Sequence, residues 1–150
     1  MGLFDIDDIL LEGTRDVSTL KWDYVKPLKV KESIDIFEKM SGSKIPSDIR
    51  SYIIKYNNGR PSKKTFNTDA SEGRVIKSLL SFNVTDADNI YDAYLALSKE
   101  NEGLIPVASD PSGNYICFTT DSRNIVLWLH ETNKTEKIAS SFNDFLKKLY

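Results

Sequence analysis

The stretch from Leu104 to Glu131 constrains the fold most, because it holds three short runs of β-favouring residues separated by two turn-forming clusters. In the second and third runs, apolar residues occupy both of the alternating positions, so neither predicted strand has a polar face. A strand of this kind is covered on both sides. The sequence therefore predicts a three-stranded meander at the centre of a sheet, with helices packed on at least one face. Its strands are residues 104–108, 114–119 and 125–129.

The first turn-forming cluster, Asp110-Pro111-Ser112-Gly113, has the composition of a type I turn. The Asp110 carboxylate can accept hydrogen bonds from backbone amides two residues further on, and Pro111 sets the backbone angle of the second turn position. Gly113 tolerates the conformation that follows. We therefore expect the chain to reverse direction at Asp110.

Apolar residues recur at helical spacing in four other segments, and local signals mark several of their ends. Gly42 supplies a left-handed stop for the first helix, and Asp86 or Asp88 offers an N-cap for the third. Ser141 and Asp144 are spaced as in a capping box at the start of the last helix. The predicted helices span residues 31–41, 46–56, 90–97 and 142–149.

Two short strands are predicted before the meander, near residues 65–68 and at 74–82, and a polar turn region is predicted after it, at 131–137. Residues 1–16 alternate bulky apolar residues with carboxylates and lack a clean period. We expect residues 1–20 to form an extension that packs on the body of the protein. No internal repeat, low-complexity tract or linker divides the chain, so residues 1–150 are expected to form one domain.

Composition limits the classes of partner and the compartment. The chain has 20 Lys and Arg against 22 Asp and Glu and a pI near 5.5, which gives no general attraction to nucleic acid or to an anionic membrane. Its single cysteine, Cys117, has no partner for an internal disulfide, which is typical of a reducing compartment. No leader and no apolar run long enough to span a bilayer is recognised. We therefore expect a cytoplasmic protein.

Charge is nevertheless unevenly distributed along the chain. Residues 1–25 hold six acidic and two basic residues, and residues 83–102 hold five acidic and one basic, whereas residues 60–77 hold five basic and two acidic. An acidic surface interleaved with tyrosines could meet and steer a basic partner, although a solvated amphipathic helix would give the same pattern. The predicted partner-binding residues are Asp7, Asp8, Asp86, Asp88, Tyr91, Asp92, Glu100 and Glu102.

Signatures of catalysis, metal binding and cofactor binding are weak. Cys117 and His130 are the one conceivable nucleophile and base, but antiparallel pairing places the partner of Cys117 near Leu127, short of His130. The acidic run at Asp86 begins like a calcium loop, yet it lacks the turning glycine and the next ligand. Zinc motifs and a glycine-rich phosphate loop are missing. The sequence therefore predicts no catalytic residues, no metal and no cofactor.

Four spaced motifs resemble the signature of the SUKH superfamily, which contains bacterial toxin-immunity proteins and yeast cell-wall-assembly regulators. The resemblance covers roughly residues 24–149, in the family's order. Its N-terminal part covers the first two predicted helices and the turn that follows them. Pro46 begins the second of these helices, and Gly59 lies in the turn. Its C-terminal part is the Asp-x-x-Gly-Asn turn, the Trp-x-His-Glu strand end and the last helix. The matching residues are Asp110, Gly113, Asn114, Trp128, His130, Glu131, Phe142 and Phe145.

The resemblance implies a single α+β domain with a mixed, mostly antiparallel sheet, helices to one side and no enzymatic activity. It also implies a protein partner, for which the leading expectation is a toxin domain, often a nuclease, that the protein binds and neutralises. A scaffolding module of the cell-wall-regulator type is the alternative, and a small enzyme is a distant third. We expect a monomer or weak dimer without direct contact to nucleic acid or membrane. Leu129 departs from the family pattern, which favours Asp there.

Overall fold

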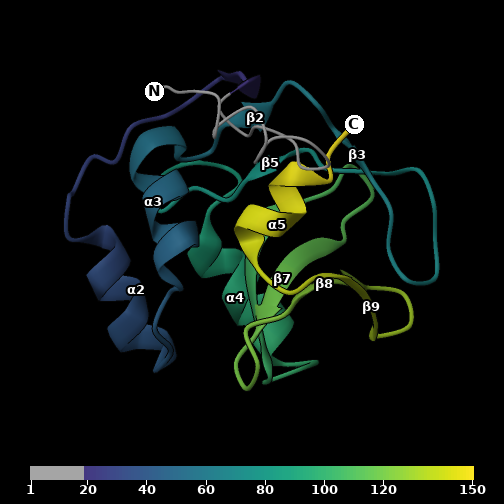
Figure 1. The fold of residues 1–150 in the computed structure, drawn as a ribbon. Coiled ribbons are helices and arrows are strands. Elements are labelled where there is room, and N and C mark those ends of the chain that lie inside the picture. Colours follow the sequence, from purple (N-terminus) through teal and green to yellow (C-terminus); the bar gives the residue numbers. More distant parts are fainter. Residues whose placement is uncertain (1–18) are drawn as a thin grey trace, which may run out of the picture.

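The computed structural model describes residues 19–150 and has the predicted α+β class. Its centre is a five-stranded sheet in which every ladder is antiparallel and the strands follow one another in chain order (Figure 1). The one parallel pairing among the described residues is an isolated bridge between Ser81 and Asn89. The strands of this sheet are β5 (Ser78–Leu79), β6 (Leu104–Ser109), β7 (Tyr115–Thr119), β8 (Ile125–Leu129) and β9 (Lys134–Ala139).

The predicted meander forms the three inner strands, β6 to β8, which confirms its central position. Nearly all of its residues are buried, as expected for strands without a polar face. The register between β7 and β8 pairs Cys117 with Val126, one residue from the predicted partner Leu127. His130 lies beyond the end of β8, so the structure does not bring it opposite Cys117.

Helices cover both faces of this sheet. Leu97 of α4 (Ile90–Ser98) packs with Cys117 and Trp128, whereas Phe145 of α5 (Phe142–Lys147) belongs to the main hydrophobic cluster with Phe118. Because Cys117 and Phe118 are neighbours in one strand, they point to opposite faces. The helices α2 (Ser33–Ser41) and α3 (Ser47–Tyr56) lie side by side at one end of the sheet, and α3 contacts α5 (Figure 1).

The segment 74–82, predicted as one strand, is divided between two sheets. β4 (Arg74–Val75) pairs with β3 (Thr65–Phe66), whereas Ser78–Leu79 joins the main sheet as β5. Ile76 donates its backbone N–H to the carbonyl of Lys64, but Lys77 already donates to the carbonyl of Ser109. The chain therefore changes its pairing partner at this point, which its irregular apolar pattern does not reveal.

The polar region 131–137 was also predicted wrongly, because its second half forms β9 at the edge of the sheet. An edge strand needs few apolar residues, since it has one neighbouring strand instead of two. The outer edge of β9 is bonded by the loop at Asp69, whose N–H donates to the Lys137 carbonyl at 2.9 Å and whose carboxylate accepts from the Lys137 N–H at 3.0 Å.

The start of the described chain is held to the body by a second small ladder. β1 (Trp22–Asp23) pairs with β2 (Arg60–Pro61), and Trp22 stacks on Tyr56 with ring centroids 5.0 Å apart. Of the expected extension, residues 1–18 lie outside the described part of the chain, and the side chain of Leu20 is buried.

Candidate functional site

A groove of about 460 Å³ opens between the start of α4 and the turn that joins β6 to β7. Two of the predicted partner-binding residues, Asp88 and Asp92, line it from the helix side. Asp110 and Tyr115 line it from the turn and from β7. The groove therefore brings two carboxylates at the start of α4 together with the turn between β6 and β7.

Asn89 fixes the start of α4 and thereby places Asp92. The side-chain oxygen of Asn89 accepts a hydrogen bond from the Asp92 N–H at 2.8 Å, so Asn89 is the N-cap rather than the predicted Asp86 or Asp88. Its side-chain nitrogen donates to the Asp86 carbonyl and to the Asp92 carboxylate, both at 3.0 Å. Asn and Asp are equally good N-cap residues, so the sequence pattern could not show which of these neighbouring residues caps the helix.

The turn opposite the helix is held by the Asp110 carboxylate, as predicted. One of its oxygens accepts from the N–H groups of Ser112 and Asn114 at 2.8 Å each, and the other accepts from the Asn114 side chain at 2.9 Å. The Asn114 side-chain oxygen in turn accepts from the His130 N–H at 3.0 Å. Because these hydrogen bonds engage both oxygens of a buried carboxylate, Asp110 shapes the groove but is not free to bind a partner.

The remaining charged groups of the groove are partly exposed. Lys77 pairs with Asp88 at 2.8 Å, and about two fifths of each side chain is exposed to solvent. Burial raises the pKa of Tyr115, and the negative charges of Asp88 and Asp92 raise it further. The carboxylates thus act on the same hydroxyl from across the groove, and together they outnumber the single lysine.

A second hollow, of about 280 Å³, lies on the other side of the same turn and is lined by Arg74, His130 and Glu131 among others. The His130 ring is close to Gly113, where an added Cβ would lie 3.5 Å from it. The neighbouring Trp128 is buried, stacks on Tyr115 and donates its ring N–H to the Asn133 side chain at 2.6 Å. The turn, Trp128 and His130 therefore form one structural unit that separates the two hollows.

The structure separates the other predicted partner-binding residues. Asp86 has a side chain that is only 10% exposed. It accepts from the Ser81 hydroxyl at 2.6 Å, and this hydrogen bond lowers the pKa of Asp86. Tyr91 packs on Phe37 and donates to the Ser33 carbonyl. Glu100 and Glu102 are exposed beyond the far end of α4, and Asp7 and Asp8 lie outside the described residues.

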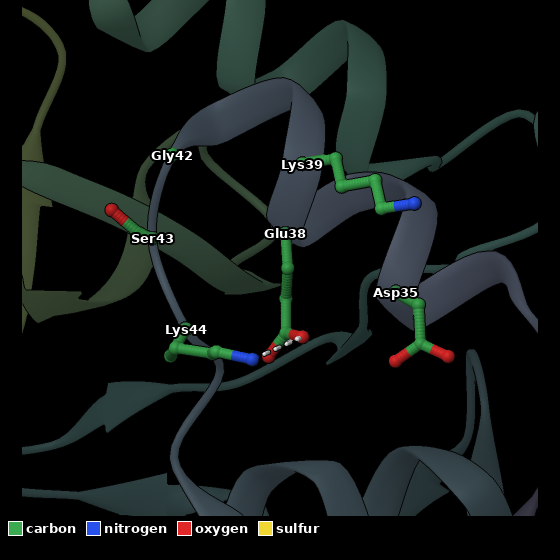
Figure 2. Close-up of a pocket in the computed structure, with 6 residues that line it drawn as sticks. All are labelled: Asp35, Glu38, Lys39, Gly42, Ser43 and Lys44. Carbon is green, nitrogen blue, oxygen red and sulfur yellow. Dashed lines mark ion pairs between the residues drawn. The ribbon is translucent and has the colours of Figure 1, made fainter.

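A larger hollow of about 480 Å³ lies at the end of α2 and is a structural junction (Figure 2). Glu38 points toward Lys44 across this hollow, at 3.8 Å, and also pairs with Arg50 of α3 at 3.6 Å. Its carboxylate accepts from the Ile45 N–H at 2.7 Å. These contacts engage Glu38 and join α2 to α3, so this hollow is a structural junction.

Within residues 19–150, no group of three or more His, Cys, Asp or Glu side chains is arranged to hold a metal ion. None of the helices in the same range is long and apolar enough to cross a membrane.

A family model, a relative and a solved structure are similar to this chain. The family model described as SUKH_6, SMI1-KNR4 cell-wall, matches residues 31–146. A relative from Bacillus subtilis (strain 168), the SPbeta prophage-derived uncharacterized protein YokK, is 27% identical, and the match covers 81% of this chain and 75% of the relative. A crystal structure of a protein from Pseudomonas syringae pv. tomato superimposes with a TM-score of 0.47 and 12% identity, over 85% of this chain and 88% of the other.

Proposed function

Since this chain belongs to the SMI1-KNR4 family of the SUKH superfamily, which includes toxin immunity proteins, we propose that it is an immunity protein that binds and neutralises a bacterial toxin domain. Proteins of this superfamily generally act by binding protein partners. The observation that supports such a role here is the acidic groove between α4 and the β6–β7 turn. The prophage origin of the relative in Bacillus subtilis accords with a gene whose product protects its host cell.

The charge of the groove favours a basic partner. Asp88 and Asp92 face solvent there beside Lys77, whereas Glu100 and Glu102 are exposed beyond the far end of α4, outside the groove. Nucleases and other proteins that act on nucleic acid carry basic surfaces to contact phosphates. A nuclease toxin is therefore the partner class whose electrostatics fit best, and its association should slow as salt is added.

The decisive experiment uses the reading frames on either side of this gene. Each frame is expressed in a bacterial host alone and together with this protein. We expect one frame to be toxic alone, harmless in the presence of this protein, and to co-purify with it. If neither frame is toxic, or if toxicity persists on co-expression, the immunity proposal is wrong for this protein.

The same experiment is sharpened by matched variants of the acidic surface. Asp88→Asn combined with Asp92→Asn should reduce protection and slow toxin association, most strongly at low salt. Asp144→Asn serves as a control, because it removes an acidic group from α5, outside the groove. Equal protection by both variants would show that the toxin binds elsewhere on the protein.

The family is also described by a connection to the cell wall, which favours a scaffolding module of the cell-wall-regulator type as the second candidate. A scaffold would bind several proteins weakly, whereas an immunity protein binds one partner tightly. Affinity capture from the native host distinguishes them by the number of partners and by their survival in a high-salt wash.

A further inference from the structure

Two buried hydroxyl groups, one of them lining the acidic groove and the other on the neighbouring strand, lack hydrogen-bond partners. Ser78 and Ser109 lie opposite each other in the register of β5 and β6, with 2% and 7% of their surfaces exposed. Neither hydroxyl has a hydrogen-bond partner among the described residues. Ser109 lines the groove. Buried polar groups are nearly always paired, so an unpaired one beside a groove indicates a place for a bound polar group.

The walls above Ser109 carry further unused acceptors. Asp92 is exposed and engages one carboxylate oxygen, through the Asn89 side chain, which leaves the other available. The Tyr115 hydroxyl makes no hydrogen bond within residues 19–150, and its ring stacks on Trp128 at 6.1 Å between centroids. Asp88 is already paired with Lys77. Acceptors thus converge on the groove from the helix, from β6 and from β7.

We propose that this groove is an arginine pocket, which receives the guanidinium of one arginine side chain from the protein partner. The inference rests on the proposed function in one respect, namely that the partner is a protein. The guanidinium donates to Asp92 and to the hydroxyls of Ser109 and Tyr115, and its plane lies against the Tyr115 ring. Its charge compensates the excess of carboxylates over Lys77.

The chemistry of the pocket selects arginine over lysine. A guanidinium is planar and offers five N–H donors in fixed directions, which suits acceptors on separate walls and an aromatic face beside them. A lysine ammonium is a compact, strongly hydrated charge without a planar face, so it cannot lie against the Tyr115 ring as a guanidinium does. The groove, at about 460 Å³, has room for the guanidinium and the methylene groups next to it.

The test uses the free protein and defined small probes. N-acetyl-arginine methylamide is titrated into ¹⁵N-labelled protein, alongside its lysine counterpart and its citrulline counterpart, which is nearly the same shape but uncharged. We expect saturable shifts of the backbone amides of Asp92, Ser109 and Tyr115 with the arginine probe. The lysine probe should bind at least threefold more weakly, and the citrulline probe at least tenfold more weakly.

Three single variants show whether the named groups are responsible. Asp92→Asn should weaken arginine binding by tenfold or more, and Ser109→Ala by severalfold. Glu102→Gln removes one negative charge from the exposed surface beyond the far end of α4 and should change the affinity by less than twofold. Because Ser109→Ala removes an unpaired buried hydroxyl, it should leave thermal stability unchanged or raise it, which separates weaker binding from misfolding.

Three results would overturn the arginine pocket. They are the absence of saturable shifts at these amides, equal binding of the citrulline or lysine probe, and equal effects of Asp92→Asn and Glu102→Gln. None of them bears on immunity, which the co-expression experiment tests separately. Conversely, the arginine probe could bind while neither neighbouring reading frame is toxic. The arginine pocket would then stand, and the immunity proposal would be wrong.

Discussion

At the scale of single residues, Asn57 connects three separate parts of the fold through one side chain. Its side chain is fully buried, and its nitrogen donates to the Lys26 carbonyl at 2.8 Å and to the Ser81 hydroxyl at 3.0 Å. Its oxygen accepts from the Phe82 N–H at 2.9 Å. One amide therefore joins the end of α3 to two segments far apart in the sequence. In the sequence, Asn57 is only the residue that follows the predicted helix 46–56.

Asn57→Ala is expected to destabilise the protein by about 2–4 kcal/mol, because it leaves several buried groups without partners. Urea denaturation followed by tryptophan fluorescence measures the change. Asn124→Ala is the control, since the Asn124 side chain makes no hydrogen bond in the described part of the chain, and it should cost less than about 0.5 kcal/mol. Equal losses in the two variants would contradict the assigned role of Asn57.

The hydroxyl of Tyr115 reports on the charge of the groove. Burial raises its pKa above the ordinary value of 10.0, and Asp88, Cys117 and Asp92 raise it further. The neutral Tyr115 hydroxyl therefore makes its full contribution to folding stability below pH 10. This contribution is lost as the pH rises through the pKa that Tyr115 has in the folded protein. Replacing Asp88 and Asp92 with Asn should lower the Tyr115 pKa, as measured by NMR of ring-labelled tyrosine. An unchanged pKa would show that the two carboxylates do not act on this hydroxyl.

At the scale of elements, the connection from α3 to β2 depends on the small size of Gly59. An added Cβ would lie 2.8 Å from the Tyr56 carbonyl oxygen and 3.1 Å from the Trp22 ring. Because a backbone atom cannot yield as a flexible side chain does, Gly59→Ala should cost about 1–3 kcal/mol in unfolding free energy. Gly103→Ala is the matched control, where the nearest atom is a side-chain oxygen at 3.5 Å. Comparable stability of the two variants would contradict this crowding.

The elements also show which structures a sequence pattern can predict. The meander and the Ser141 cap were predicted because their signals are local, in the alternation of apolar residues and in a hydroxyl three residues before an amide. β9 and the division of residues 74–82 depend on which strand lies alongside, and that information is not local. The groove is a similar case. Asp88 and Asp92 were identified by their charge, but Ser109 and Tyr115 join them only through the register of the sheet.

At the scale of the whole molecule, one hydrophobic cluster extends from Leu20 to Leu149 and includes residues of all four described helices. The N-terminal helices and the C-terminal sheet therefore share a core. Asn57 adds polar connections between the end of α3 and the segment that follows β5. We expect the described chain to unfold as a single cooperative unit, and Cys117 provides a means to measure this.

Cys117 is fully buried in β7, between two neighbouring strands, and burial raises the pKa of its thiol well above the ordinary range. Reaction with a thiol reagent needs an exposed thiolate, so it should proceed only when the sheet opens. If opening is global, a variant destabilised by about 2 kcal/mol should react about 30-fold faster, since each 1.4 kcal/mol changes the open population tenfold. Asn57→Ala, located away from β7, is the informative variant. A rate that stays constant while its stability falls would show that Cys117 is exposed by local opening of the sheet and that the two parts unfold separately.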